Sequence, residues 1–365
     1  MSRVREEIGP IDRIVFTSDW LRVTDLRHAR YPNPQRTNIA WTAHLFAPIF
    51  ESILGCPSVQ IALDEESLTL DRYELYRMHG VDFSTQGWAY LYNKELSEEA
   101  EAALAPLFER AFVVAYEMPP YMRAMFARHG VPYLDLTIHP VRFMEDYLLA
   151  MRSSVPALRQ ALVAHFVPDR AIARQVRLIR ALAERRLQTE PDPPDGSAVF
   201  IGQMAIDAAL IIGDRHATQQ DAEDAIVDML RRHSRLYYKP HPHLRDTGWI
   251  DALVDSEPGL ILTDVNVYDL LGSGRVTEIG GLSSSVLFEA GHFGVAARRY
   301  LDNGHHLTGA GEVPGPDQFA PVLPRVLEES VWGAAFAGAE WVADPDGLQL
   351  RDAAIKGTLN MTWGR

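Results

Sequence analysis

The sequence predicts an α/β protein built from two domains with a cleft between them, and three observations lead to this prediction. Short apolar runs of strand length alternate with helical patterns in both halves, which is typical of βαβ units with mainly parallel sheets. The length of 365 residues is too great for one ordinary core. The stretch "TEPDPPDGSA" at 189–198 combines proline, glycine and acidic residues, as linkers do.

The first domain is expected at 1–190. Its strands are predicted from the apolar runs at 13–20, 58–63, 110–120 and 133–138. His139-Pro140 marks a turn, after which we expect a helix to about 154. The following stretch, 155–188, is rich in Arg and Ala and is predicted to be helical.

The second domain is expected at 191–340. Strands predicted at 198–203, 235–239, 259–263 and 275–279 alternate with helices around 219–233, around 249–255, in the short stretch before 275, and from Ser285. Ligands of such sheets bind at the carboxyl ends of the strands. The last segment, 341–365, is a candidate to return to the first domain.

Charge and cysteine content exclude several classes of protein. The formal net charge of −14 argues against general nucleic-acid binding and against a polybasic membrane anchor, although a local pocket can still bind an anionic small molecule. Cys56 is the single cysteine, so neither a disulfide nor a cysteine-based zinc site is expected. The N-terminus lacks an apolar signal-peptide core, and no run of about 18 apolar residues could span a membrane. We expect a cytoplasmic protein, with peripheral association at the inner face of the inner membrane as an alternative.

The stretch "KPHPH" follows a predicted strand and is a candidate phosphate site. A residue before proline is held extended, so Lys239 and His241 lie on a stiff backbone. The ammonium of Lys239 and a ring N–H of His241 both suit a phosphate oxygen. An ordinary proline-rich turn fits equally well. A metal site at His241 and His243 is less well supported, because no other ligands stand at suitable spacing.

The stretch "GGLSSSVLFEAG" places Ser283, Ser284 and Ser285 at the start of a predicted helix. Hydroxyls and free N–H groups at such a turn can hold an anion. Glu289 lies one turn beyond Ser285 on the same face, where its carboxylate could accept hydrogen bonds from ribose. A plain helix cap with an acidic residue is the alternative.

The stretch "GQMAIDAALIIGD" also follows a strand and contains Gln203 and Asp207. An aspartate in an apolar run is expected to be either a cap or a functional group. Because all these stretches follow predicted strands of one sheet, we expect them to meet at one edge.

The first domain contributes candidate residues of its own. Asp19 and Glu117 stand where strands are predicted to end, and His139, Arg142 and Asp146 follow the strand at 133–138. These side chains could bind an acceptor or a sugar, and each could equally be part of a salt bridge or a cap.

Together these stretches resemble bacterial glycosyltransferases that use CMP-activated ulosonic acids. The combination of Gly-Gln…Asp-Ala, Lys-Pro-His-Pro, Thr263-Asp264…Asn266…Tyr268-Asp269-Leu270 and Ser-Ser…Glu is most similar to the retaining β-Kdo transferases of O-antigen and capsule polysaccharide assembly. The resemblance covers about 113–294 and includes "YEMPPYMRAMFARHGVPYLDLTIHPVRFMEDYLLA".

The resemblance implies a GT-B-like architecture of two Rossmann-like domains, with the nucleotide on the second and the acceptor on the first. It implies that Asp207 is the nucleophile and that Lys239, His241 and Ser283–Ser285 hold the CMP phosphate. Gln203 belongs to the same nucleotide site, Glu289 would bind ribose, and Asp19, His139 and Arg142 would contact acceptor or sugar. It also implies a reaction without metal or cofactor. Partners would be a CMP-sugar donor, a glycan or glycolipid acceptor such as a lipopolysaccharide precursor, and other glycan-assembly enzymes.

The proposed chemistry leaves alternatives open. Departure of CMP leaves an oxocarbenium-like carbon that a nearby carboxylate can trap, and a second inversion by the acceptor gives net retention. The acceptor needs a base, for which Glu117 and His139 are the candidates. The alternatives are an inverting sialyltransferase in which Asp207 is structural and Asp19 or Glu117 is the base, a nucleotide-sugar epimerase, and a non-catalytic nucleotide-binding partner.

Overall fold

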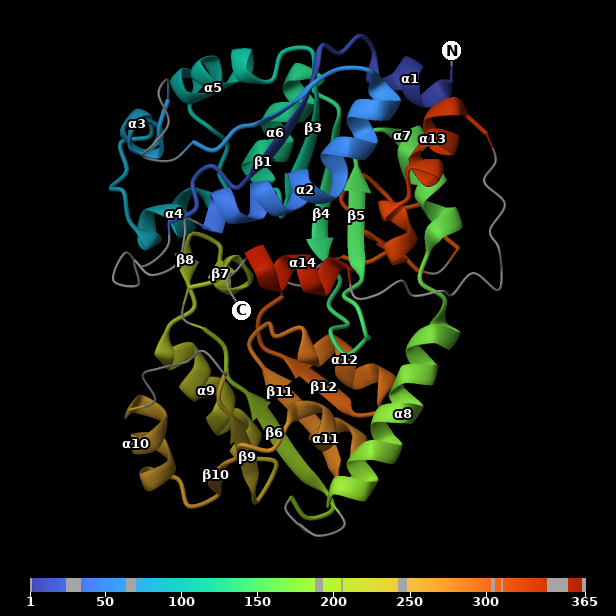
Figure 1. Cartoon of the computed structure of the whole chain (residues 1–365). Helices are drawn as coiled ribbons and strands as arrows, with labels where there is room; N and C mark the ends of the chain where they lie inside the picture. The colour runs from blue at the N-terminus through green and yellow to red at the C-terminus, as the bar shows by residue number, and fades with distance from the viewer. Residues whose placement is uncertain are drawn as a thin grey trace. The chain divides into compact units, whose positions relative to one another are not determined.

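The computed structural model describes residues 2–23, 34–63, 70–187, 193–204, 206–241, 248–302, 306–309, 311–339 and 354–362. These residues form two compact units, shown in Figure 1. The first comprises described residues within 1–139, 145–167 and 305–365, and the second those within 140–144 and 168–304. Both units are α/β, so the predicted fold class of two Rossmann-like α/β domains is confirmed.

The first unit contains a six-stranded sheet in the order β13-β5-β4-β3-β1-β2. Strands β1 to β4 are parallel, whereas β5 runs antiparallel to β4 and β13 antiparallel to β5. The strands are β1 (Arg13–Ser18), β2 (Ser58–Gln60), β3 (Ala111–Tyr116), β4 (Tyr133–Ile138), β5 (Leu149–Ser153) and β13 (Ala320–Val322).

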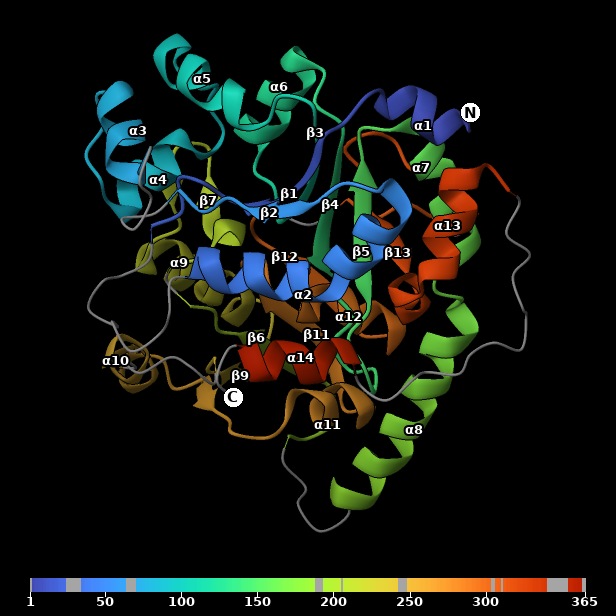
Figure 2. The same ribbon diagram turned by 45° about the horizontal axis from the view of Figure 1, so that its top comes forward.

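Helices cover both faces of this sheet, and Figure 2 shows α2 in front of it with α6 behind. The α-helices are α1 (Arg3–Ile8), α2 (Pro34–Leu54), α3 (Arg72–Met78), α4 (Thr85–Tyr92), α5 (Glu98–Leu104), α6 (Pro120–His129), α7 (Pro156–Leu162), α13 (Glu329–Ala337) and α14 (Ala354–Thr362). Short 3₁₀ turns among the described residues of this unit are η2 (Ala105–Leu107), η3 (Val163–His165) and η5 (Pro324–Leu327).

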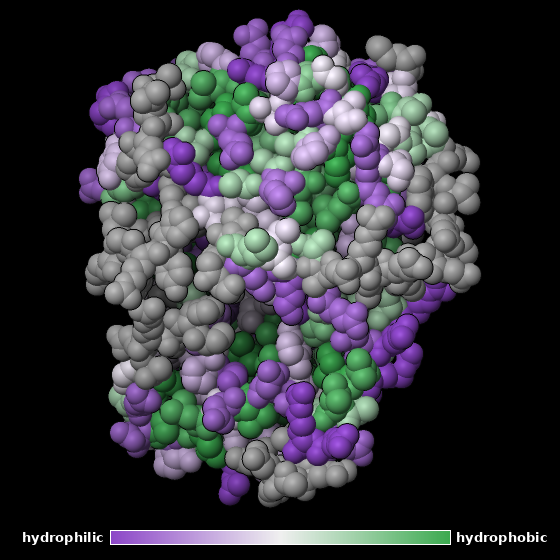
Figure 3. Space-filling view, viewed as in Figure 1, coloured by the Kyte–Doolittle hydropathy of each residue, from purple (hydrophilic) through white to green (hydrophobic). Residues whose placement is uncertain are grey.

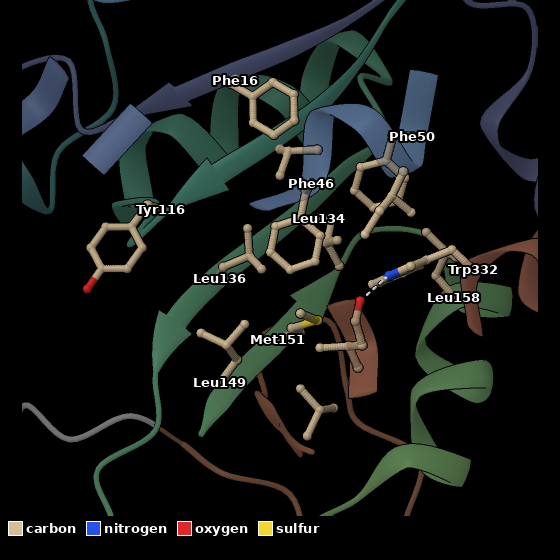
Figure 4. Close-up of a cluster of buried hydrophobic side chains, with 14 of the residues drawn as sticks. Phe16, Phe46, Phe50, Tyr116, Leu134, Leu136, Leu149, Met151, Leu158 and Trp332 are labelled. Atoms are coloured by element: carbon tan, nitrogen blue, oxygen red, sulfur yellow. Dashed lines mark hydrogen bonds between the residues drawn. The ribbon is translucent and has the colours of Figure 1, made fainter. Parts of the chain in front are cut away.

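An aromatic cluster between α2, the sheet and α13 forms the core of the first unit, as Figure 4 shows. The ring of Phe50 lies 5.9 Å from that of Phe46, 5.7 Å from Phe112 and 5.0 Å from Trp332, measured between centroids. The indole N–H of Trp332 donates to the carbonyl oxygen of Val326 at 2.6 Å, so its one polar group is satisfied inside the core.

The second unit has a five-stranded sheet in the order β10-β9-β6-β11-β12, and every pairing is parallel. Its strands are β6 (Ser197–Ile201), β9 (Leu236–Lys239), β10 (Leu260–Leu262), β11 (Val276–Gly281) and β12 (Ala296–Arg299). A short hairpin of β7 (Ile211–Ile212) and β8 (Arg215–His216) follows η4 (Ala208–Leu210).

Helices lie on both sides of the second sheet in Figure 1, with α9 and α10 on one side and α8, α11 and α12 on the other. They are α8 (Asp169–Leu187), α9 (Gln219–Leu230), α10 (Gly248–Ser256), α11 (Val267–Gly272) and α12 (Val286–His292). The side chain of Thr218 and that of Asp221 form a reciprocal capping box that begins α9. Within the described ranges, no helix is both long and apolar enough to cross a membrane.

Two sequence-based expectations differ from the structure. The helix predicted after His139-Pro140 is wrong, because 149–153 form β5, which is buried along its whole length and pairs with β4. A short apolar run cannot be told from a buried helix by its periodicity alone. Strands β7, β8, β12 and β13 were not predicted.

The division between the units also differs from the predicted boundary at 190. Helix α8 belongs to the second unit, because it packs closely on α11: a Cβ at Gly272 would lie 2.9 Å from the Cβ of Ala183. The short segment 140–144 belongs to the second unit too, although the chain on either side of it lies in the first.

Helix α14 belongs to the first unit, where Ile355 and Leu359 join the main core. The buried carboxylate of Asp146 accepts hydrogen bonds from the backbone N–H groups of Ile355 at 3.0 Å and Lys356 at 2.7 Å. Asp146 therefore holds the start of α14, which is the cap that the sequence allowed as an alternative to a site residue.

The aromatic cluster yields a test of the core. We expect Phe50→Ala to lower the free energy of unfolding by about 3–5 kcal/mol, because it removes a buried ring and leaves a cavity. Urea unfolding followed by circular dichroism measures the change. Tyr90→Ala, at a position 41% exposed, is the control and should lower the free energy of unfolding by no more than about 1 kcal/mol. Equal losses in both variants would contradict the assignment of this core.

Candidate functional site

The strand order of the second unit places a switch point between β6 and β11. From β6 the chain proceeds to β9 and β10 on one side, and then returns to β11 and β12 on the other side. Ile201 on β6 is in register with Lys239 on β9 and with Gly281 on β11. The segments after these residues therefore emerge side by side at the carboxyl edge. Ligands of open α/β sheets bind outside this edge at such a switch point.

Two hydrogen bonds between Gln203 and Ser283 cross the switch point. The amide N–H₂ of Gln203 donates to the hydroxyl of Ser283 at 3.1 Å, and the backbone N–H of Ser283 donates to the amide oxygen of Gln203 at 2.7 Å. The structure thus brings together the predicted Gly-Gln stretch and the predicted serine turn, which are 80 positions apart in sequence.

Gly202 allows β6 to end close to β9. Its N–H donates to the carbonyl oxygen of Lys239 at 2.9 Å. A Cβ at this position would lie 2.4 Å from the hydroxyl oxygen of Tyr238, and Tyr238 is itself buried. A side chain larger than hydrogen would force the buried tyrosine to move, which gives the glycine of the Gly-Gln stretch a packing reason.

Lys239 is the last residue of β9 and His241 follows it, on the far side of β6 from the serines. The ammonium of Lys239 donates to the backbone carbonyl of Asp264 at 3.0 Å, so it lies over the loop that follows β10. Two strand spacings, about 10 Å, separate the backbones of β9 and β11. Both residues are half-buried, and His243 lies outside the described residues.

The remaining two serines differ in their hydrogen bonds. The Ser284 hydroxyl accepts from the N–H of Val286 at 3.4 Å, whereas the Ser285 hydroxyl bonds to none of the described residues and does not cap α12. Ser285 therefore keeps a hydroxyl available next to Ser283 at the carboxyl edge. Helix α12 itself is short, seven residues, so the hydroxyls rather than a helix dipole are the notable donors here.

Arg299 is a cation at this edge that the sequence analysis missed. It is the last residue of β12 and is in register with Gly281. Its guanidinium donates to the carbonyl oxygen of Ser283 at 3.3 Å, and burial lowers the pKa of this group. The signal in the sequence was the short run "AARRY" after the helix at Ser285. Finding Arg299 required recognising this run as one more parallel strand that ends at the same edge.

Asp207 is exposed in the loop between β6 and α9 and caps η4. Its Oδ1 accepts from the N–H of Ala209 at 2.9 Å. Its other oxygen, Oδ2, makes no hydrogen bond to the described residues. The carboxylate is therefore oriented through Oδ1, as the cap interpretation expected, and the role of Asp207 as a nucleophile stays a prediction.

Glu289 is fully buried on α12 and is held inside the protein. Its Oε1 accepts from the backbone N–H of Arg142 at 2.6 Å and from the hydroxyl of Tyr268 at 3.2 Å. Burial raises the pKa of Glu289 to about 7, although these donors oppose the rise. Its predicted contact with ribose stays a prediction, since the carboxylate already has internal partners.

Arg142 requires a correction, because it lies in the second unit and not in the first. The backbone bond to Glu289 holds it there, and the next residue, Phe143, packs edge-on against Tyr268 and Phe293 at 5.9 and 5.3 Å between ring centroids. Tyr268 was noted in the sequence only as part of a motif. Its contacts with Glu289 and Phe143 make it an organiser of this region.

Asp19 and Glu117 follow neighbouring strands of the first unit, since Ser18 is in register with Tyr116. Asp19 is buried, and burial raises its pKa even though it accepts from Tyr121, from the Trp88 indole at 2.9 Å and from the N–H of Leu21 at 3.0 Å. Both of its oxygens are occupied. The geometry therefore supports a role in positioning these neighbours, and contact with an acceptor stays a prediction.

Glu117 is the partly exposed carboxylate of this edge, with 32% of its side chain accessible. Its oxygens lie 3.9 Å from the guanidinium of Arg22 and 3.3 Å from the hydroxyl of Thr137. Its backbone φ of +52° is rare for a residue other than glycine and is a strained conformation of the kind found at functional sites. His139, by contrast, is buried, and its backbone N–H donates to the backbone carbonyl of Leu148 at 2.9 Å.

No family model matches the sequence, and a search of curated proteins found no match. The chain is similar to two solved Kdo transferases. Both are from Thermosulfurimonas dismutans. The first, KpsC, β-Kdo 2,7 transferase, has 16% sequence identity and a TM-score of 0.33, and the match covers 66% of this chain and 80% of that chain. The second, KpsC, β-Kdo 2,4 transferase, has 13% sequence identity and a TM-score of 0.34, and the match covers 69% of this chain and 74% of that chain. Likeness at this level establishes neither a family nor an activity.

None of the described residues forms a group of three or more His, Cys, Asp or Glu side chains placed to hold a metal ion. Among the described residues, Lys239 and Arg299 are cationic groups at the carboxyl edge of the second unit, and Gln203, Ser283 and Ser285 are neutral donors there. Such a set can bind an anion with several oxygens through charge-assisted and neutral hydrogen bonds.

Glu289 gives a pH-dependence with a defined sign. The folded-state pKa of about 7 lies above the ordinary value of 4.5, so folding binds a proton between these values and stability falls as pH rises through that window. In Glu289→Gln this loss should disappear. As pH rises from 4.5 to 8, the free energy of unfolding of the variant should increase relative to that of wild type by up to about 3 kcal/mol.

Thermal and urea unfolding across that pH range measure the difference. Glu184→Gln, at an exposed position on α8, is the control and should keep the wild-type pH profile. A parallel profile in Glu289→Gln would show that Glu289 does not titrate in this window.

Proposed function

We propose that this protein is a glycosyltransferase that moves Kdo or a related ulosonic acid from its CMP donor to a glycan acceptor. The observation that carries the proposal is the meeting of the Gly-Gln, Lys-Pro-His and Ser-Ser-Ser stretches at the switch point of the second unit, where Gln203 and Ser283 are hydrogen-bonded. These are the stretches in which the sequence resembles CMP-ulosonic acid transferases.

The donor phosphate would lie at this edge. Lys239, His241 and Arg299 would offset its charge, and the Ser283–Ser285 turn would supply hydroxyl donors. Donors aimed at a leaving phosphate lower the barrier by about 3 kcal/mol for each well-placed group. These side chains provide the charge for a reaction that we propose needs neither metal nor cofactor.

Asp207 would act as the nucleophile. In the first step the bond between the sugar carbon and the phosphate oxygen breaks with its electron pair going to CMP, and the Asp207 carboxylate forms an ester with the sugar. In the second step the acceptor hydroxyl attacks the same carbon, loses its proton to a base and releases Asp207, so the configuration is retained. The availability of Oδ2 supports this role.

Glu117 is the best candidate for the acceptor base, because it is partly exposed where Asp19 and His139 are buried. The acceptor would be a bacterial surface glycan or glycolipid. We propose that the protein works in the cytoplasm and that other glycan-assembly enzymes are its candidate partners.

An inverting CMP-sialic-acid-type transferase is the second candidate, and one observation favours it. Asp207 caps η4 through Oδ1, as a purely structural aspartate would. In that mechanism the acceptor displaces CMP directly, Glu117 or Asp19 takes its proton, and no covalent sugar forms on the protein.

Nucleotide preference tests the donor class. We expect CMP to raise the melting temperature more than UDP or GDP does, because a ligand that binds only the folded state stabilises it by mass action, by about 2.7 kcal/mol at 100 times its dissociation constant. Lys239→Met should weaken the effect of CMP, whereas Arg231→Gln should not, because Arg231 is exposed at the C-cap of α9, before the amino end of β9. Equal shifts with all three nucleotides would contradict the proposal.

Intact-protein mass spectrometry tests the nucleophile. Wild type incubated with CMP-Kdo and no acceptor should gain the mass of one sugar, and Asp207→Asn should gain none and lose turnover by on the order of 10³-fold or more. Asp214→Asn, an exposed aspartate of the β7–β8 turn, should behave as wild type. Full turnover in Asp207→Asn without any adduct would favour the inverting mechanism instead.

A further inference from the structure

Helix α8 carries an arginine-rich face that the proposed chemistry does not use. Its 19 residues, Asp169–Leu187, contain six arginines against Asp169 and Glu184. The formal net charge of the whole chain is −14, so this positive helix stands out from an acidic protein.

One side of α8 is buried in the second unit. Ile172, Val176 and Ala183 are all buried, and Ala183 packs on Gly272 of α11. Two arginines have partners within the unit as well: the guanidinium of Arg180 donates to the carbonyl of Phe293 at 2.7 Å, and that of Arg186 pairs with Asp269 at 3.0 Å.

The opposite side of α8 combines leucine and arginine. Leu178 and Leu182 are 49% and 42% exposed, among the most exposed large apolar side chains described. Arg174 lies one turn before Leu178 and Arg185 follows Leu182 by three positions, so helical geometry places all four on one face. Figure 3 shows hydrophilic and hydrophobic side chains side by side over the region of α8, at the lower right.

Arginines of this face have no hydrogen bond or ion pair with any described part of the chain. Arg174, Arg177 and Arg185 are exposed, and none has a hydrogen bond or ion pair to the described residues. In contrast to Arg180 and Arg186, their charge is directed to the surroundings of the protein.

We propose that the face of α8 made by Arg174, Arg177, Leu178, Leu182 and Arg185 docks the protein on a bilayer that contains anionic phospholipid. Guanidinium groups pair with lipid phosphates, and leucines of the same face enter the boundary between headgroups and acyl chains, as in other helices that lie in a membrane surface. The acidic remainder of the chain is repelled by such a surface, so contact through this face is favoured over contact through others.

The two leucines favour a bilayer over a nucleic acid or an acidic protein segment. Phosphates of a nucleic acid would leave both leucines facing water, and an acidic segment would match the arginines but not the apolar centre of the face. A helix of 19 residues is about 28 Å long, which offers a straight line of contact to a flat surface.

Vesicle flotation with the full chain tests this. Wild type should bind vesicles of phosphatidylcholine with 30% phosphatidylglycerol, at about 0.1 M salt, and not vesicles of phosphatidylcholine alone. The double variant Arg174→Gln/Arg177→Gln should bind about 30-fold more weakly, which is about five-fold for each charge removed. Arg231→Gln/Arg235→Gln makes the same charge change at two other exposed positions of the second unit and should bind as wild type.

A second variant, Leu178→Ser/Leu182→Ser, isolates the apolar contribution. It should bind more weakly than wild type while keeping the wild-type dependence on salt, since its charges are unchanged. Circular dichroism and the melting temperature establish that each variant is folded. Absence of binding by wild type, wild-type binding by Arg174→Gln/Arg177→Gln, or equal weakening of both arginine pairs would each overturn the proposal.

Discussion

The parallel pairing of β6 with a strand on each side is the constraint on which the candidate site depends. Ile201 is in register with Lys239 and with Gly281, so three strands end at one level. The backbone ladder thereby brings Gly202, Lys239 and the serine turn to one edge before any side chain makes a contact. The two bonds between Gln203 and Ser283 then fix the ends of the central pair of strands to each other.

Glycine and tyrosine make this arrangement possible at close range. The end of β6 passes so near to Tyr238 that even a methyl group at Gly202 would overlap its hydroxyl. The N–H of Gly202 is consequently able to bond to the carbonyl of Lys239, which fixes the backbone from which Lys239 and His241 project. The position of the side chains that we propose to bind a phosphate thus depends on a residue that has no side chain.

Each unit contains a buried carboxylate that holds neighbouring segments in place. Asp19 gathers Trp88, Tyr121 and the N–H of Leu21, and Glu289 gathers Tyr268 and the N–H of Arg142. In both cases burial raises the pKa, and several donors partly offset that cost. Such groups keep neighbouring loops in place, while the exposed carboxylates Asp207 and Glu117 have the access that chemistry requires. Exposure therefore separates the candidate acids more clearly than sequence position does.

The sequence by itself determined the α/β class, most strands of both sheets, and the location of Gln203, Lys239 and Ser283 at or just after the ends of strands. Apolar runs of strand length and Gly, Pro and Ser turns are local signals. It did not determine that β5 is a strand, since the run at 149–153 is buried on both faces and reads equally well as a helix. Only the tertiary structure decided which of two units receives α8 and the segment around Arg142, and that Arg299 ends beside Ser283. Those outcomes depend on packing and hydrogen bonds between residues more than a dozen positions apart, and no local pattern in a single chain records such contacts.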